Sequence, residues 1–482
     1  MINLIIILSY EYDIIVVGAG VSGSSAIRSA LDYAESVGAK IKVLMLERAD
    51  PNISGGSSRY TTAYLRLNDD CTAPSDQLLN DVVEYLGSDV RIDLWERMQR
   101  EGAEVIKWLK GHGVNIEPLK ITMFLTAKRP RCAPVGGGAA IIEALLPRAI
   151  ISEGLQIAYR STAWKIALDA NGNIEGVYVR QEDGTSVKVT SKAVILATGG
   201  FQGSRALLKE YIGGNAEYLK SILARHEVYH KDEDLRMVLE VGADLDGEFG
   251  NFHAEPVDAR NDEIDPVILT YPYGILVNIY GERFVDEGIG TVEEYYDYIA
   301  KEIFKQPMNR VFLIADKKIF DIPNYQNAIL SGLPPIEANT IEELVRRLVD
   351  YGLKDPNKLI KTIKEYNHAK RSNMTYDPLR LDGLYVQDIV PPKSNWAVPI
   401  DTPPFIAYPM EARITYAYIG LKTDTNARVL DTSGNWIKGL WAVGELIGGL
   451  YRRGHLGGTS VFRGIFYGYI AGRDAVNYVF SR

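Results

Sequence analysis

The feature that most constrains the fold is a glycine-rich turn close to the start of the chain. An apolar run, 13–17, leads into Gly18-Ala19-Gly20-Val-Ser-Gly23 and then into small residues typical of a closely packed helix, 24–34. Glycine permits the sharp turn and the close approach of a pyrophosphate, and the third glycine lets the helix pack on the strand. The helix N-terminus then binds the phosphates. A second apolar strand ends in Glu47, 27 residues after Gly20, where a carboxylate accepts hydrogen bonds from a ribose. The pattern predicts a dinucleotide site.

Six further segments identify the kind of dinucleotide. Two more apolar strands end in Ala-Thr-Gly (193–200) and in Gly-Glu (439–445), and distinctive segments occur at 55–62, 273–287, 421–430 and 457–460. With these segments the chain resembles the two-dinucleotide-binding-domain flavoproteins, and within them the fumarate reductase/succinate dehydrogenase flavoprotein family. The tricarballylate dehydrogenase-like and ketosteroid dehydrogenase-like branch is the most similar. The matching segments run in the family's order from about residue 12 to residue 473.

The resemblance implies an α/β fold, a Rossmann-like FAD-binding domain with an inserted α+β capping domain. We expect the FAD-binding domain at 11–242 and 351–482, and the capping domain at 243–350. The loop 55–62 has no histidine, the residue that tethers FAD in respiratory members, so FAD should bind non-covalently. The residues expected to bind FAD are Gly18, Ala19, Gly20, Gly23, Glu47, Arg48, Ser57, Ser58, Thr62, Ala63, Ala163, Thr198, Gly199, Glu445, Ser460 and Val461.

Hydrophobic periodicity predicts where the main elements lie. Helices are expected within 78–113, at 139–151, at 358–370 and at 462–481, and a small antiparallel sheet at 155–189. Asp169–Gly172 and Glu182–Gly184 have the composition of hairpin turns.

Composition excludes several kinds of partner. The net charge of −9 argues against nucleic acid, because polyanion binding requires a basic surface. Two cysteines, Cys71 and Cys132, indicate no disulfide framework, no metal site and no haem or iron–sulfur attachment, and they fit a reducing compartment. The apolar start, 1–8, is too short to span a bilayer, and no basic residue precedes Arg28. We therefore expect a cytoplasmic protein without a transmembrane segment.

The substrate pocket is expected to depart from that of the dicarboxylate enzymes. In those enzymes an arginine after the capping segment donates a proton, whereas here 288–296 contain none. A second family arginine falls on His455, and a family histidine falls on or beside Tyr416. One histidine, His253, is kept, and Arg452 is a candidate replacement for the lost clamp or a solvated loop residue. The tyrosines at 271, 273, 416, 418 and 451 fall in segments that line the family's pocket.

Three functions are compatible with these residues. The first is an FAD-dependent oxidoreductase acting on a small molecule with a CH–CH or C=C bond beside a carbonyl or carboxylate, by hydride transfer through the flavin and with a separate electron carrier. The second is a flavoprotein subunit or binding module with a degenerate pocket. The third, an amine- or amino-acid-oxidising flavoenzyme, shares the first motif but should lack the segment 273–287.

Overall fold

A parallel sheet lies at the centre of one lobe of this computed structural model, which describes residues 11–119, 124–127, 131–146, 154–223 and 232–481. Its strands follow the order β17-β18-β8-β1-β2-β5, and only the β17–β18 pair on this path is antiparallel. The strands are β1 (Glu11–Val17), β2 (Val43–Leu46), β5 (Leu155–Ala158), β8 (Ser186–Leu196), β17 (Arg428–Leu430) and β18 (Trp436–Ala442). Apolar residues run continuously through β2 because both faces of the sheet are covered. We call this part the nucleotide lobe, and it confirms the predicted α/β class.

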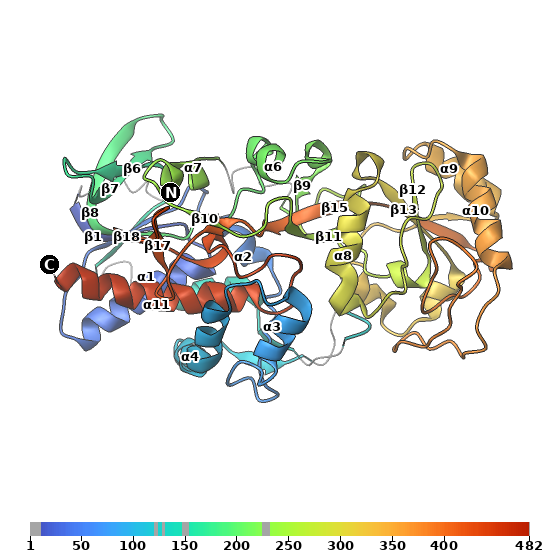
Figure 1. Cartoon of the computed structure of the whole chain (residues 1–482), viewed down its shortest axis with the longest axis horizontal. Helices are drawn as coiled ribbons and strands as arrows, with labels where there is room; N and C mark the ends of the chain where they lie inside the picture. The colour runs from blue at the N-terminus through green and yellow to red at the C-terminus, as the bar shows by residue number, and fades with distance from the viewer. Residues whose placement is uncertain (1–10, 120–123, 128–130, 147–153, 224–231, 482) are drawn as a thin grey trace.

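Two helices that are far apart in sequence pack against each other beside this sheet. They are α1 (Val21–Ser36) and the C-terminal helix α11 (Ser460–Phe480), which run side by side in Figure 1. A side chain at Gly472 would clash with the Ala26 carbonyl oxygen and lie 3.0 Å from the Ala30 nitrogen. The small residues of the two helices therefore allow their backbones to approach closely.

Further helices and small strands complete the nucleotide lobe. The helices are α2 (Gly56–Tyr60), α3 (Leu78–Leu86), α4 (Ile92–Gly111), α5 (Gly137–Leu145), α6 (Arg205–Tyr211) and α7 (Asp232–Leu239). The small strands are β3 (Ile116–Pro118), β4 (Cys132–Pro134), β6 (Thr162–Leu168), β7 (Ile174–Arg180), β10 (Leu245–Asp246) and β16 (Gly420–Leu421). β6, β7 and β8 form the predicted antiparallel sheet, although β5 joins the parallel sheet instead. The helix predicted at 139–151 is present to residue 145, and its last part lies outside the described residues.

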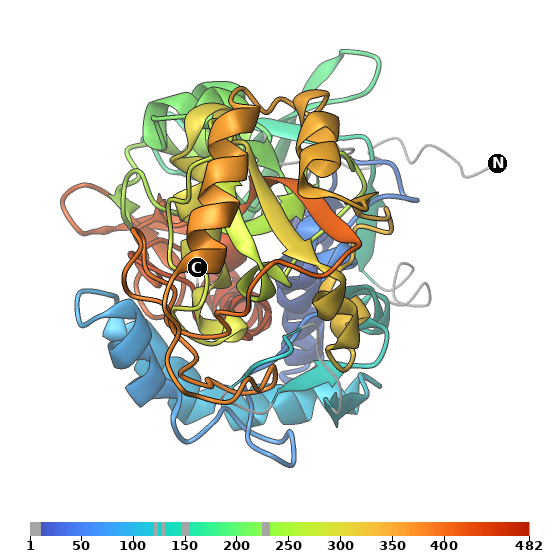
Figure 2. The same ribbon diagram turned by 90° about the vertical axis from the view of Figure 1, so that its right-hand side faces the viewer.

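A second sheet forms the other lobe, on the right of Figure 1. Its strands are β9 (Lys220–Ser221), β11 (Phe252–Asp258), β12 (Ile275–Asn278), β13 (Val311–Asp316), β14 (Ile336–Ala338) and β15 (Phe405–Ala417). Its helices are α8 (Val292–Phe304), α9 (Ile341–Val349) and α10 (Pro356–His368), and the last two lie in front of the sheet in Figure 2. We call this part the capping lobe.

The capping lobe extends beyond the boundary expected at residue 350. Leu344 and Leu348 of α9 share one apolar core with Leu359 and Ile363 of α10 and with strands β12 and β13. The amphipathic helix expected near 358–370 therefore packs in this lobe rather than in the nucleotide lobe. The division of the chain into domains stays a prediction. Its second boundary, expected at residue 350, differs from the structure because α10 packs in the capping lobe.

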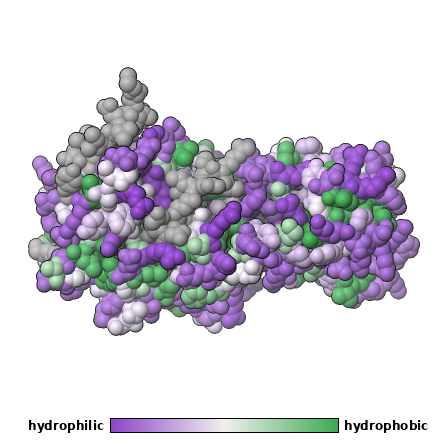
Figure 3. All heavy atoms as spheres, turned by 90° about the horizontal axis from the view of Figure 1, so that it is seen from above, coloured by the Kyte–Doolittle hydropathy of each residue, from purple (hydrophilic) through white to green (hydrophobic). Residues whose placement is uncertain are grey.

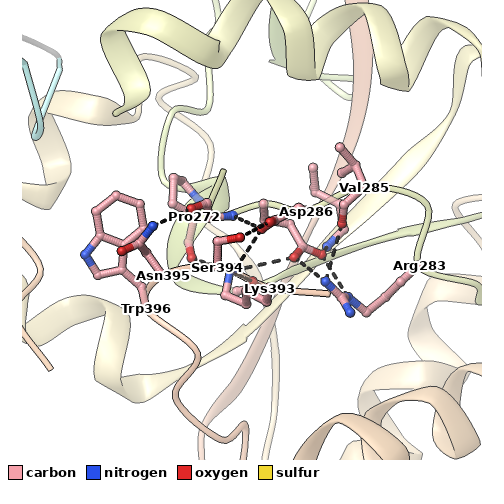
Figure 4. A network of polar contacts seen from close by, with 12 residues as sticks. Pro272, Arg283, Val285, Asp286, Lys393, Ser394, Asn395 and Trp396 are labelled. Carbon is pink, nitrogen blue, oxygen red and sulfur yellow. Dashed lines mark hydrogen bonds and ion pairs between the residues drawn. The ribbon is translucent and has the colours of Figure 1, made fainter. Parts of the chain in front are cut away.

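Charged residues of the segment 273–287 have structural partners inside the capping lobe (Figure 4). The Arg283 guanidinium pairs with the Glu287 carboxylate at 2.6 Å, and the fully buried Lys393 ammonium donates to the carbonyl oxygens of Pro272 and Gly274 at 2.6 and 3.0 Å. Burial lowers the pKa of Lys393 to about 8, against the opposing attraction of Glu287. This network ties the loop around residues 391–396 to the start of β12.

The two cysteines form a disulfide, contrary to the sequence-based expectation of none. Cys71 and Cys132 are 61 residues apart in sequence and 6.0 Å apart between Cα atoms. Cys132 is brought there because its main chain exchanges hydrogen bonds with Leu65. Pairing over this separation depends on tertiary structure that the cysteine count does not reveal. Disulfides are typical of oxidising compartments and also occur in intracellular proteins of hyperthermophiles.

Hydrophilic side chains predominate on the face shown in Figure 3, with apolar ones interspersed among them. Within the described ranges, none of the helices combines the length and the apolar character that a membrane crossing requires. The apolar residues at 1–8 lie outside the described part of the chain.

Candidate active site

The glycine-rich turn and Glu47 are joined as the sequence predicts. β1 ends at Val17, the turn follows, and the Glu47 carboxylate at the end of β2 accepts the Ala19 N–H at 3.0 Å and the Ala49 N–H at 2.8 Å. Glu47 is 5% exposed. Burial raises the pKa of its carboxyl, while these main-chain donors act in the opposite direction. Four lone-pair positions on the carboxylate leave acceptor capacity for a ribose.

A cavity surrounds this turn and contains most of the residues predicted to bind the nucleotide. We call it the nucleotide cavity. The predicted residues that line it are Gly18, Ala19, Gly20, Glu47, Arg48, Ser57, Ser58, Ala163, Thr198, Gly199 and Glu445. Gly23 does not line it, because it packs against the Gly18 carbonyl as predicted for the third glycine. Thr62 and Ala63 do not line it either, and Ala63 is buried with its N–H bonded to the Thr61 hydroxyl at 3.0 Å.

A second cavity continues from the first, which fits a long dinucleotide. We call it the flavin-side cavity, and it shares Ser22, Ser57, Ser58 and Glu445 with the nucleotide cavity. Its other walls include the predicted Ser460 and Val461, which open α11. The positive end of this helix dipole suits the N1–C2=O edge of a flavin, which becomes anionic on reduction. The two cavities thus fit a nucleotide at one end and an isoalloxazine at the other.

Glu445 lies where the two cavities meet. It is half-buried, and its Oε1 accepts the Ala417 N–H at 3.3 Å. Burial raises the pKa of this carboxyl to about 7, although the positive charge of Arg463 opposes the shift. The position is consistent with the predicted contact to the ribityl chain of FAD.

Three of the four predicted catalytic residues come together between the lobes. The rings of His253 and His455 are 4.1 Å apart, and the Tyr416 ring lies 5.0 Å from that of His253. The Tyr416 hydroxyl and His455 Nδ1 share a 2.5 Å hydrogen bond, and His253 Nε2 bonds the Tyr296 hydroxyl at 2.8 Å. We call these four residues the His–Tyr cluster.

Burial keeps the His–Tyr cluster uncharged near neutral pH. It lowers the pKa of both His253 and His455 well below the usual range, and the charge of Lys301 lowers that of His253 further. Burial also raises the pKa of Tyr416 and Tyr296 well above the usual range. His455 is therefore neutral at the position where the sequence predicts that the family's anion-binding arginine is replaced, and Tyr416 keeps its proton.

Arg452, the fourth predicted catalytic residue, is not part of this cluster. Its guanidinium pairs with Asp246 at 2.5 Å and donates to the Gly247 carbonyl oxygen at 2.9 Å. Tyr418 and Tyr451 do pack against Tyr416, with ring centroids 5.7 and 5.5 Å away. By contrast, Tyr271 and Tyr273 lie at the start of β12, where the Tyr273 hydroxyl donates to the Pro378 carbonyl oxygen.

Two arginines beside the cluster were missed by sequence reasoning. Arg66 pairs with Asp81 at 2.6 Å and with Glu293 at 3.5 Å, and Arg131 makes a close ion pair with the same Glu293. Glu293 lies in the first turn of α8, next to Thr291, where the family arginine is absent. The only sequence signal for Arg66 and Arg131 is a charged residue within a buried stretch, which does not reveal a partner more than 160 residues away.

A third cavity, of about 310 Å³, opens on the other side of His455. It lies between α3, α8 and the loop 453–457, and we call it the outer cavity. Its charged lining residues are Arg66, Glu84, Glu293, Glu294, Asp297, Lys301 and Arg453. His455 lines the outer cavity and Tyr416 lines the flavin-side cavity, so their hydrogen bond connects the two.

A protein-family model described as "FAD binding domain" matches residues 13–461. The chain belongs to this family. Vinyl phenol reductase of Lactiplantibacillus plantarum is 26% identical over 514 residues, which cover 97% of each chain. NADH:acrylate oxidoreductase of Vibrio harveyi is 27% identical over 404 residues, which cover 80% of this chain and 37% of that relative. The open conformation of a flavocytochrome c3 fumarate reductase matches with a TM-score of 0.76 at 22% identity, covering 97% of this chain and 78% of that one.

These matches confirm three predictions from the sequence: the flavoprotein family, FAD as the cofactor, and the fold with an inserted capping domain. The protein is an FAD-dependent oxidoreductase of the class that acts on CH–CH or C=C bonds. The chain spans only 37% of the length of the acrylate relative, so the NADH chemistry and the substrate of that relative are not assigned to this protein.

Proposed function

We propose that this protein reduces a C=C bond in an uncharged, conjugated small molecule, with Tyr416 as the proton donor. The observation that carries the proposal is the 2.5 Å hydrogen bond between the Tyr416 hydroxyl and His455 Nδ1, two groups whose shifted pKa values keep both uncharged near neutral pH. Arginine serves as the acid in the dicarboxylate enzymes that the chain resembles, and residues 288–296, where it is expected, contain none. Tyr416 offers an alternative acid on the wall of the flavin-side cavity.

The proposed reaction balances with one hydride and one proton. Reduced FAD, which residues of the nucleotide cavity such as Gly20 and Glu47 would hold, would be the source of the hydride for one carbon of the double bond. Tyr416 Oη gives its proton to the neighbouring carbon, and the saturated product leaves. A proton from solvent restores the phenol through His455, whose ring lines the outer cavity. General acid catalysis of this kind typically contributes about 10²–10⁴-fold to the rate.

The charges around the outer cavity support an uncharged substrate. Its cations already have carboxylate partners: Arg66 pairs with Asp81, Lys301 with Asp297 at 2.8 Å, and Arg453 with Asp89 at 3.2 Å. A dicarboxylate entering there would have to displace one of these pairs. Tyr416 instead offers an aromatic ring on the wall of the flavin-side cavity, and the buried rings of Tyr418 and Tyr451 pack against it from behind. The name of the vinyl phenol reductase is consistent with this class of substrate.

The test is anaerobic reoxidation of the reduced, FAD-loaded protein by a panel of acceptors. We expect an uncharged styrene-like or enone acceptor to reoxidise the flavin faster than fumarate or acrylate. Tyr416→Phe should slow that reoxidation by about 10²–10⁴-fold. Tyr418→Phe is the matched control, because the Tyr418 hydroxyl donates to Asp297 rather than to His455. Brisk turnover of fumarate by the wild type, or an unchanged rate in Tyr416→Phe, would overturn the proposal.

We also propose that electrons reach this protein from a separate carrier. Both cysteines are joined in the Cys71–Cys132 disulfide, which leaves no thiolate for haem attachment or an iron–sulfur cluster. We likewise propose a location in the cytoplasm.

A further inference from the structure

One buried cation in the flavin-side cavity has no acceptor in the protein. Arg463 lies in the first turn of α11, is 3% exposed and lines the cavity with Ser460 and Val461. Within the described residues its side chain makes no hydrogen bond to protein, and its buried Nε has no partner. A guanidinium carries five N–H donors, and leaving the buried Nε donor of Arg463 unsatisfied is costly. The side chain is therefore placed to bind something that the protein itself does not supply.

The position of Arg463 in the helix makes its charge more unusual. The first turn of a helix carries the positive end of the dipole, which disfavours a cation there. Two aromatic faces offset part of this cost, since the guanidinium carbon lies 5.4 Å from the Tyr416 ring centroid and 5.0 Å from that of Tyr451. The positive charge of Arg463 lowers the pKa of the Glu445 carboxyl. Burial has the larger, opposite effect and leaves that carboxyl partly protonated near neutral pH. Glu255 and Asp265 also line this cavity, but burial raises the pKa of both carboxyls, so an anionic partner for Arg463 is still missing.

We propose that Arg463 binds the pyrimidine edge of the bound flavin and raises its reduction potential. The guanidinium and the start of α11 face the same cavity, so both positive charges act on the same group. That edge gains negative charge when the flavin is reduced, and a buried cation stabilises the reduced form more than the oxidised form. The inference rests on FAD binding, which the family establishes, and not on the identity of the substrate.

The test compares Arg463→Gln with Arg473→Gln in FAD-loaded protein without substrate. Arg473 is on the same helix, also contacts an aromatic ring, and lies far from the cofactor cavities, with its guanidinium 4.7 Å from the Tyr33 ring centroid. The readouts are the midpoint potential and the dissociation constant for sulfite, which adds to oxidised flavin more tightly when positive charge lies near the N1–C2=O edge. We expect sulfite binding to weaken at least about tenfold in Arg463→Gln, with a fall in potential equivalent to about 30 mV for a two-electron couple. Arg473→Gln should match the wild type.

A second variant and a second measurement keep the proposal testable if Arg463→Gln binds FAD poorly. Arg463→Lys retains the charge, so its sulfite affinity should stay within about threefold of the wild type. The rise in melting temperature on adding FAD should be smaller for Arg463→Gln than for the wild type, because the unliganded protein no longer buries an unsatisfied cation. An unchanged potential in Arg463→Gln with a raised KM for substrate would overturn the proposal and assign Arg463 to the substrate instead.

Discussion

The Cys71–Cys132 disulfide should make a large contribution to stability. It closes a loop of about 61 residues that contains all of α3 and α4. In the chain-entropy account, cross-linking a loop of this length reduces the entropy of the unfolded chain by an amount worth about 4 kcal/mol at 25 °C. Because a stability of about 5–15 kcal/mol is typical of folded proteins, this would be a substantial share. The double variant Cys71→Ser/Cys132→Ser should therefore unfold at clearly lower urea concentration than the oxidised wild type.

The assay is urea unfolding of both proteins with and without a phosphine reductant. Reduction should lower the unfolding midpoint of the wild type towards that of the double variant, whereas the double variant should not respond to the reductant. A thiol titration of the unreduced wild type in denaturant should find no free thiol. Two titratable thiols, or equal midpoints for the oxidised wild type and the double variant, would refute the reasoning.

The remaining predictions concern the cofactor and the site. Glu47→Ala should weaken FAD binding by about 10–150-fold, because one hydrogen bond to a charged group contributes roughly 1.5–3 kcal/mol; equal retention of FAD by variant and wild type on dialysis would contradict this. Acid precipitation should release all the yellow colour, since FAD is held without a covalent bond, and a coloured pellet would show a tether. The difference in unfolding free energy between the wild type and His455→Asn should fall as the pH drops below about 6.5, at most by about 1.4 kcal/mol per pH unit. The reason is that His455 takes up a proton in the unfolded chain but not in the folded protein. Glu255 and Asp265, whose carboxyl pKa values burial raises, act in the opposite direction but are common to both proteins, so a pH-independent difference would contradict the neutral histidine. Thr291→Arg alone should raise fumarate turnover little, and only Thr291→Arg with His455→Arg should raise it further; a large gain from the single variant would show that His455 is not the missing clamp.

Local patterns predicted the nucleotide end of the molecule well. The turn Gly18–Gly23 and the acid Glu47 lie within one strand–helix–strand unit, so their geometry follows from short-range backbone rules. The same holds for helices such as α4, whose apolar face is visible in the spacing of its residues. The order of the family motifs was also enough to predict that His253, Tyr416 and His455 lie close together.

The errors concern relations that sequence spacing does not encode. Arg452 is three residues from His455, but its side chain turns to Asp246, more than 200 residues away in sequence. The disulfide and the ion pair between Arg131 and Glu293 are likewise set by tertiary contacts. Periodicity located α10 correctly as a helix, yet its membership of the capping lobe depends on an apolar core shared with strands far away along the chain.

The paired strands β11 and β15 contain an irregularity directly beside the His–Tyr cluster. The ribbon runs from the sheet of the capping lobe towards the nucleotide lobe (Figure 1), and its register shifts between His253 and Ala254. Such a bulge bends and twists a strand pair at one point while the rest stays stiff. His253 and Tyr416 are paired across the two strands at this point. A rotation of the capping lobe about the irregularity would therefore move both side chains. Opening the site to admit a substrate and taking apart the hydrogen bond to His455 would then be one and the same movement.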